Sequence, residues 1–256
     1  MATFGIGDIH GNIRALDDLL ARITPKIGDR DTVVFLGDYI DRGPDSKACI
    51  ERILDFRQTA KAMVVALLGN HEQWLLKTHR DHTRHSWILG MQGFSTIQSY
   101  SSEAAVRLDE EFRSPGPRIV LEHVSVPYQI FFDVVPAEHL EFFSSLSTFH
   151  RTPDAVCVHG GLDPAGGRAE EQADANLIWG AVGFPTGYQG SDPIIYGHAH
   201  DPVIDRAGWP HPRVVGHTYG LDTIGEDVLT ALRLPDGAVF QSRRFQPNRI
   251  RSSTSD

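Results

Sequence analysis

The sequence predicts a layered α/β domain, and three observations support this prediction. Short apolar runs alternate with segments in which apolar residues recur at helical spacing, as in a sheet covered by helices. Of the 256 residues, 41% are hydrophobic and 22% are charged, which is enough apolar material for a sizeable core. Finally, polar clusters follow several of the apolar runs. We expect one domain over residues 1–245 and a loose polar tail over 246–256.

Three apolar runs in the first part of the chain predict strands. They lie at 3–6, 32–36 and 62–68. The run TVVFL at 32–36 is continuous, which is typical of a strand buried on both faces, and 62–68 is expected to be buried as well. Helical spacing predicts helices at 12–23 and 46–56, with Ser46 as a plausible cap, and the start of a third at 72–78.

The middle of the chain, from about 80 to 126, has a mixed pattern and is interpreted as a helical insertion or lid. A further helix is expected at 137–146, and strands at 155–158 and 193–196. Residues 229–234 and 238–241 flank Pro-Asp-Gly and predict a hairpin. Three histidines of the insertion, His79, His82 and His85, recur every third residue; we interpret them as a solvated helix face rather than a metal patch.

Composition excludes several classes of protein. The longest apolar stretch has seven residues, whereas a helix needs about 20 to span a bilayer. A net charge of −9 argues against a sequence-independent nucleic-acid binder. No secretory signal is apparent at the start, and two cysteines, Cys49 and Cys157, suit a reducing cytoplasm, where we expect the protein to act. The sequence does not indicate an oligomeric state.

Five polar clusters follow predicted strands. They are GDIHG at 7–11, GDYIDRG at 37–43, GNHE at 69–72, HGG at 159–161 and GHAH at 197–200. In α/β sheets, ligands bind beyond the carboxyl ends of strands, and all five clusters fall at such ends. Any single Asp or Asn could instead cap a helix or form a turn, but turn formation does not explain three histidines at strand ends.

The residue types of these clusters are those of a metal site. Asp8 and His10 are two residues apart, so both side chains point the same way in an extended segment and can hold one cation. Asp38 ends its strand and could bridge two cations. Asn70, His159 and His198 would complete a second site. A set of oxygen and nitrogen donors without thiolate suits Mn, Fe or Zn.

Two further residues predict acid–base chemistry. His71 is adjacent to Asn70 and points elsewhere, so we expect it to be a proton donor rather than a ligand. Asp41 would orient the His71 imidazole and raise its pKa. Arg42 could form paired hydrogen bonds with a phosphate; the alternative for Asp41 and Arg42 is a surface ion pair.

The five clusters, in this order, resemble the metallophosphoesterase superfamily and specifically its phosphoprotein-phosphatase branch. The segments WILGMQGFSTIQSY, VHGGLDP, LIWG and LDTIGEDVLTALRL are also similar to small bacterial and lambda-phage-like Ser/Thr phosphatases. The resemblance implies a β-sandwich flanked by helices, with a dinuclear metal site at the strand edge. It implies one metal on Asp8, His10 and Asp38, and a second on Asp38, Asn70, His159 and His198. His71 would protonate the leaving group, Asp41 would support it, and Arg42 and Asn70 would bind phosphate.

Two departures from the family pattern affect the predicted site. Relatives commonly have an Arg two residues after the Trp of LIWG, where this chain has Ala181; Arg168 or Arg206 could replace this phosphate clamp. The second departure is GHAH, in which His200 could act as an extra ligand. His217 follows a weaker apolar run, so we assign the ligand to His198.

We therefore expect a metal-dependent phosphomonoesterase, most simply a Ser/Thr protein phosphatase with two divalent ions such as Mn²⁺. Attack by a metal-bridging hydroxide would need no Cys or Ser nucleophile. A symmetrical bis(5′-nucleosyl)-tetraphosphatase would use the same residues and is the alternative, so the partner is a phosphorylated protein or peptide, or a nucleotide. A non-catalytic metal-dependent binding protein is disfavoured because it would not need the His71–Asp41 pair.

Overall fold

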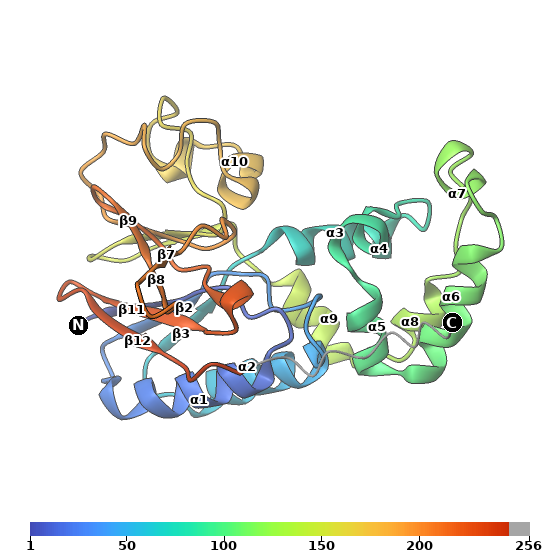
Figure 1. Ribbon diagram of the computed structural model, residues 1–256, viewed down its shortest axis with the longest axis horizontal. Helices are drawn as coiled ribbons and strands as arrows, with labels where there is room; N and C mark the ends of the chain where they lie inside the picture. The colour runs from blue at the N-terminus through green and yellow to red at the C-terminus, as the bar shows by residue number, and fades with distance from the viewer. Residues whose placement is uncertain (246–256) are drawn as a thin grey trace.

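The computed structural model describes residues 1–245, so the predicted tail at 246–256 lies outside the described residues. Two five-stranded sheets pack face to face, with helices on their outer faces (Figure 1). The fold confirms the predicted α/β class and the β-sandwich flanked by helices. A group of helices extends from one edge of the sandwich, beside the ends of the strands (Figure 1).

The first sheet contains the chain's N-terminal strands and its C-terminal hairpin. Its order is β12-β11-β1-β2-β3, and β1, β2 and β3 run parallel. The bounds are β1 Thr3–Ile6, β2 Thr32–Phe35, β3 Met63–Ala66, β11 Thr230–Leu234 and β12 Ala238–Gln241. The predicted hairpin is therefore confirmed. The predicted burial of β3 was wrong. This strand lies at the edge of the sheet, so it is only partly buried, and Met63 is 53% exposed.

The second sheet is built from shorter strands, in the order β4-β5-β6-β10-β9. Strands β5 and β6 are the two that the sequence predicted. The bounds are β4 Phe149–Arg151, β5 Val156–Val158, β6 Ile194–Tyr196, β9 Arg213–Val215 and β10 Thr218–Gly220. Strands β7 (Val203–Ile204) and β8 (Pro210–His211) form a separate small hairpin. The short strands that the sequence did not predict lack the continuous apolar run that marks β5 and β6.

Alternating side chains of the strands build a layered core. Val33 and Phe35 of β2 belong to the apolar core between the first sheet and the helices that cover it, whereas Val34 faces the second sheet. Cys157 and Ile195 meet Val34 between the sheets. The sheets are so close that a Cβ on Gly5 would lie 2.7 Å from Cγ2 of Ile195. Both cysteines are buried and free, as small apolar side chains.

Two helices cover the outer face of the first sheet and one short helix lies on the second (Figure 1). They are α1 Ile13–Ile23, α2 Ser46–Thr59 and α10 Asp174–Trp179. The predicted cap of α2 was wrong: Asp45 is the N-cap, and its carboxylate accepts from the Ala48 amide at 3.0 Å. Ser46 instead accepts from the amide of Asp41 at 3.1 Å.

The predicted insertion is helical and continues beyond residue 126. It follows α3 Asn70–Arg80, and its helices are α4 Ser86–Met91, α5 Phe94–Tyr100, α6 Ser102–Arg113, α7 Arg118–Leu121, α8 Gln129–Phe132 and α9 Ala137–Ser144. Single 3₁₀ turns lie at η1 Thr24–Lys26, η2 Ala169–Glu171 and η3 Ile224–Glu226. We use "helical insertion" for α4 to α9.

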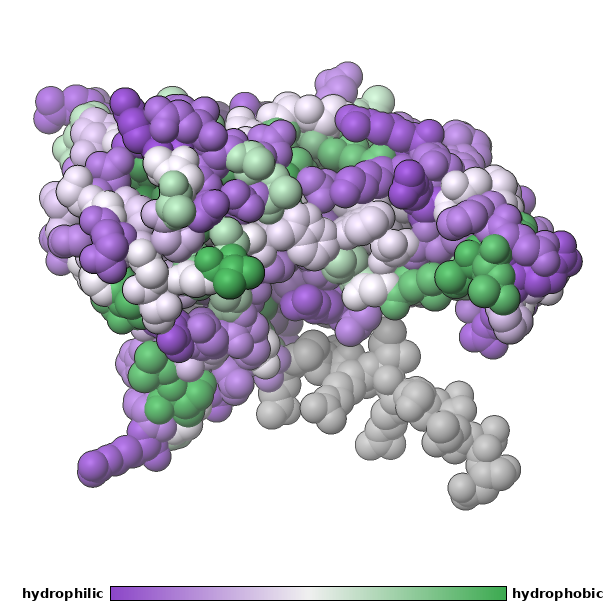
Figure 2. Space-filling model, turned by 90° about the horizontal axis from the view of Figure 1, so that it is seen from above, coloured by the Kyte–Doolittle hydropathy of each residue, from purple (hydrophilic) through white to green (hydrophobic). Residues whose placement is uncertain are grey.

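The surface is mostly polar, with separate apolar patches (Figure 2). One green patch lies at the end of the molecule formed by the helical insertion (Figure 2). Val106, Val120 and Leu121 of the insertion are each more than half exposed. None of the helices between residues 1 and 245 combines the length and the apolar character needed to cross a bilayer.

Candidate metal and phosphate site

The predicted residues come together because their strands end at the same edge. Asp8 and His10 follow β1, Asp38 follows β2, and Asn70 follows β3 in the first sheet. His159 follows β5 and His198 follows β6 in the second sheet. Because β1 to β3 are parallel and β5 and β6 are parallel, these loops meet where the two sheets and the helical insertion converge.

The first of two ligand groups joins the two sheets. The ligand atoms of Asp38, His159 and His198 lie within 4.8 Å of one another. The Oδ1 atom of Asn70 lies 2.9 Å from His159 Nε2 and 3.0 Å from His198 Nδ1. Turning the amide instead lets its nitrogen donate to both imidazoles. A cation would be held here by the orientation in which the oxygen faces inward.

The orientation of His159 suits a metal ligand. Its Nδ1 lies 2.9 Å from the carbonyl oxygen of Leu36, to which it can donate, and this bond leaves the lone pair of Nε2 directed toward Asp38, 3.3 Å away. Such a hydrogen bond from the second ring nitrogen is typical of metal-binding histidines. Burial lowers the pKa of His159, but Asp38 raises it more, to about 10. The position therefore strongly favours positive charge.

The second ligand group shares Asp38 with the first. It comprises His10, Asp38 and His71, again within 4.8 Å. His10 Nδ1 lies within hydrogen-bond distance, 2.9 Å, of the carbonyl oxygen of Ile40, and its Nε2 lies 3.6 Å from the Asp38 carboxylate. The predicted ligand Asp8 is in neither group, and His71 stands in its place in this one; both Asp8 oxygens accept from the His198 amide at 3.1 Å. Asp38 thus occupies the shared position that the sequence suggested.

The carboxylates of the site repel one another. Burial and the neighbouring Asp222 raise the pKa of Asp8 well above its ordinary value. For Asp38, burial acts in the same direction, but His159 and His71 outweigh it and hold the pKa well below its ordinary value. Divalent cations would neutralise these charges, so the donor set fits hard metal ions.

Asp222 is a site residue that the sequence analysis missed. It is 3% exposed, and neither carboxylate oxygen has a hydrogen-bond partner among the described residues. A buried carboxylate without a donor is costly, which also points to a cation nearby. The available signal was its position just after β10, since the other site residues also follow strands.

His71 and Asp41 form the expected pair. His71 Nδ1 lies 2.7 Å from Asp41 Oδ2, both side chains are fully buried, and Nε2 of His71 has no hydrogen-bond partner within residues 1–245. Burial lowers the pKa of His71, but Asp38 and Asp41 raise it above its ordinary value. Because Nε2 belongs to the second ligand group, the structure leaves this atom available either to a proton or to a cation.

The helical insertion holds Asp41 in place. Trp87 of α4 donates Nε1–H to both Asp41 oxygens at 3.1 Å, and Thr96 of α5 donates its hydroxyl at 2.6 Å. Both side chains are fully buried. The sequence analysis assigned neither Trp87 nor Thr96 a role at the site. The insertion is therefore part of the site and does more than cover it.

Glu72 fixes the loop that carries Asp38. Its carboxylate accepts from the amides of Asp38 and Tyr39, at 3.0 and 2.8 Å. In this loop Arg42 donates NH1 to His10 Nε2 at 2.9 Å, so the predicted phosphate-binding residue reaches the site. The backbone is unusual here. Positive φ angles occur at non-glycine site residues: His10 (45°), Asp38 (53°), Asp41 (68°), Arg42 (63°) and His198 (60°).

Other predicted residues lie outside the two ligand groups. His200 is 40% exposed and its Nδ1 lies 3.7 Å from Asp222. Arg168 is exposed and pairs with Glu170 at 3.6 Å, away from the site, and Arg206 is exposed in the turn between β7 and β8. The described structure therefore places neither arginine as a replacement clamp. Ala181 lines a hollow beside His198.

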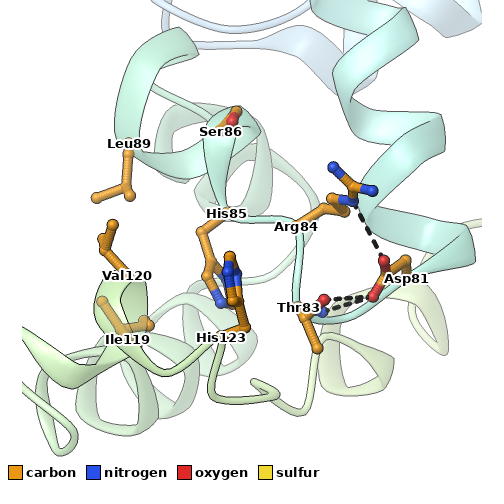
Figure 3. A pocket seen from close by; sticks show the side chains of 9 residues that line it. All are labelled: Asp81, Thr83, Arg84, His85, Ser86, Leu89, Ile119, Val120 and His123. Atoms are coloured by element: carbon orange, nitrogen blue, oxygen red, sulfur yellow. Dashed lines mark hydrogen bonds and ion pairs between the residues drawn. The ribbon is translucent and has the colours of Figure 1, made fainter.

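A different hollow, of about 420 Å³, lies between α4 and α7 in the helical insertion (Figure 3). His85 and His123 lie side by side in it (Figure 3). The solvated-face interpretation was wrong for His85, which is 6% exposed and within 2.9 Å of the Tyr128 hydroxyl. The three histidines lie in α3, in the following loop and at the start of α4. Within residues 1–245, they form no metal-binding group.

Two ligand groups that share a carboxylate, at the common edge of two sheets, suit a hydrolase with a dinuclear metal site. Comparison with known proteins agrees: the chain belongs to the calcineurin-like phosphoesterase family, whose match covers residues 1–238. It is therefore a hydrolase of the metallophosphoesterase class that uses divalent metal ions, and the superfamily predicted from the sequence is confirmed.

Several proteins similar to this chain are named as dinucleoside tetraphosphatases. The chain is 26% identical to the asymmetrical bis(5′-nucleosyl)-tetraphosphatase PrpE of Oceanobacillus iheyensis, over 94% of this chain and 92% of the relative. It is 38% identical to a symmetrical bis(5′-nucleosyl)-tetraphosphatase of Acidovorax, over 30% of this chain and 25% of that protein. The fold resembles the crystal structure of a candidate diadenosine tetraphosphatase, with a TM-score of 0.59, 18% identity, and coverage of 94% and 92%.

Proposed function

We propose that the protein hydrolyses dinucleoside polyphosphates with the help of two divalent metal ions. The observation that carries this proposal is a pair of ligand groups sharing Asp38, beside the His71–Asp41 pair. The choice of substrate is supported by PrpE, a dinucleoside tetraphosphatase similar to this chain over nearly its whole length.

Each ligand in the proposal has a structural reason. Asp38, Asn70, His159 and His198 would hold one metal ion. His10 and Asp38 would hold the other, and we propose Asp8, which accepts from the His198 amide, as its third ligand. When bound, the metals would supply charge neutralisation of the phosphates and activation of water. Mn²⁺ is our first choice, with Fe or Zn as alternatives, because the donors are nitrogen and oxygen atoms only.

The other residues act on the substrate. His71 would give a proton from Nε2 to the leaving group, while Asp41 holds its other ring nitrogen. Arg42 would move from His10 Nε2 to a phosphate oxygen when a metal takes that nitrogen. His200 Nδ1 lies 3.7 Å from Asp222, and we propose His200 as a secondary metal ligand.

A Ser/Thr protein phosphatase is the second candidate function. The motifs GDIHG, GDYIDRG and GNHE favour it, because they match the phosphoprotein-phosphatase branch closely. Glu72 in the third motif anchors the Asp38 loop, so its presence reflects local structure and cannot discriminate between substrates.

The experiment compares two substrates on the same Mn²⁺-loaded protein. We expect a higher kcat/KM for diadenosine tetraphosphate than for a phosphoserine peptide. Separation of the products distinguishes symmetrical cleavage, which yields two ADP, from asymmetrical cleavage, which yields ATP and AMP. A higher kcat/KM for the phosphopeptide would overturn the proposal in favour of the second candidate.

A further inference from the structure

A hollow of about 370 Å³ opens directly beside the ligand His198. Its walls are mainly apolar and aromatic, and include Trp179, Phe184, Pro185, Tyr196 and Ala181. The volume falls within the roughly 300–1,000 Å³ typical of small-molecule sites. Because His198 is both a wall of the hollow and a member of a ligand group, a molecule could contact both places at once.

The aromatic walls are held in position. The ring of Trp179 lies 6.0 Å from the ring of His198, and its Nε1 donates to Gln73 Oε1 at 2.9 Å. On the other wall, Phe184 packs edge-on to Tyr196 with ring centroids 4.9 Å apart. Rings fixed by neighbours can bind a flat aromatic group with little loss of their own freedom.

The hollow differs in charge from an ordinary phosphate subsite. Ala181 stands where relatives of this family commonly carry an arginine, and the next residue, Val182, is fully exposed at the surface. Apart from His198, none of the described residues that line the hollow carries a side chain that can become positive. The walls therefore suit an uncharged, flat ligand.

We propose that this hollow binds the nucleobase of a nucleotide whose phosphates lie at the Asp38–His159–His198 group. This inference rests on the proposed function and names the recognition element for its substrate. A base is flat and stacks on aromatic side chains, whereas its phosphates stay with the metals and Arg42. Small residues at 180 and 181 leave room for it in place of a guanidinium.

Binding of two non-hydrolysable probes to the Mn²⁺-loaded protein tests the inference without turnover. Methylenediphosphonate carries only the phosphonate groups, and adenosine 5′-(α,β-methylene)diphosphate adds the nucleoside. By calorimetry we expect the nucleotide to bind at least about tenfold more tightly. Equal affinities for the two probes would overturn the inference.

Variants of the two rings locate the base. In Phe184→Leu and Trp179→Leu, affinity for the nucleotide should fall by about 5- to 100-fold, while affinity for methylenediphosphonate changes less than about twofold. Trp209→Leu is the matched control, since Trp209 lies at the β7–β8 hairpin outside the hollow, and it should change neither affinity. Metal content is measured for each variant, because Trp179 contacts His198.

The Ala181→Arg variant should change the affinities for the two probes in opposite directions. The added guanidinium should strengthen binding of methylenediphosphonate and weaken binding of the nucleotide. If ring variants with normal metal content weaken both probes equally, or weaken neither, the base does not bind here and the inference fails. It also fails if Trp179 affects KM for a phosphopeptide but not affinity for the nucleotide.

Failure of the inference and failure of the proposed function give different results. Hydrolysis of diadenosine tetraphosphate together with equal affinity for the two probes would retain the function and remove the base site. Nucleotide-selective binding that depends on Phe184, without hydrolysis of diadenosine tetraphosphate, would retain the base site and remove the function.

Discussion

The β-sandwich and the helical insertion contribute to the site in different ways. The side chains of both ligand groups come from loops that directly follow strands of the sandwich, or, for His71, from the first turn of α3 just after β3. The insertion supplies Trp87 and Thr96, which contact Asp41 and reach the ligands only through His71. It also places Met91 3.6 Å from the amide nitrogen of Asn70. The sandwich thus builds the site, and the insertion orients it.

The largest expected effect comes from the shared carboxylate. Asp38→Asn should remove metal from both ligand groups, and phosphohydrolase activity should fall to background, because Asp38 belongs to both groups. Metal analysis of dialysed protein and an activity assay provide the measurement. His217→Asn, in an exposed turn, is the control and should behave as the wild type. Retention of both metals in Asp38→Asn would contradict a shared ligand.

His71→Asn is expected to lower kcat by roughly 10²–10⁴-fold on a substrate with a poor leaving group. The loss should be much smaller on an activated aryl phosphate, which needs little protonation. Metal content should stay near that of the wild type, because Nε2 would act as a proton donor rather than a ligand. Loss of metal in this variant would instead assign His71 Nε2 to the second ligand group.

Metal binding should stabilise the β-sandwich more than the helical insertion. Metal in hundredfold excess over its Kd raises the free energy of unfolding by about 2.7 kcal/mol. We expect a lower Tm after treatment with a chelator, and its recovery with Mn²⁺. Hydrogen exchange should show the gain in protection at the site loops first, and more weakly at Trp87 and Thr96 because they contact the site through Asp41. Equal protection throughout the insertion would mean a closer coupling than these contacts imply.

The smallest effect is expected from the orienting residues. Trp87→Phe and Thr96→Val each remove a donor to the Asp41 carboxylate and should lower kcat by about tenfold, the equivalent of ~1.4 kcal/mol. Metal content should not change. The double variant combined with His71→Asn should add no further loss of kcat, since Asp41 acts through His71. An additional loss would show that the insertion contributes by another route.

The same division explains what the sequence could predict. Asp8, Asp38 and His159 were recognisable because each lies in a short motif that directly follows an apolar strand. Trp87 and Thr96 are 46 and 55 residues from Asp41 in the sequence, and no local pattern relates them. The bonds from these donors exist only because the insertion folds back over the GDYIDRG loop.

The other misses have local causes. Strands β4, β9 and β10 have three residues each and mix apolar with polar or small residues, whereas the equally short β5 and β6 are continuous apolar runs. Arg168 was considered as a clamp on charge alone, but its partner Glu170 holds it elsewhere. Asp222 could have been found by applying the strand-end rule to the segment LDT.

The left-handed backbone at five non-glycine residues of the site limits how heat-tolerant this enzyme can become. Each such residue costs on the order of 1–3 kcal/mol, and four of the five are also proposed here to touch metal or phosphate: His10, Asp38, Arg42 and His198. Glycine would relieve the strain at any of them and would delete the functional side chain at the same time. Selection for thermal tolerance must therefore act elsewhere in the chain, because stability gained in these loops is lost as activity.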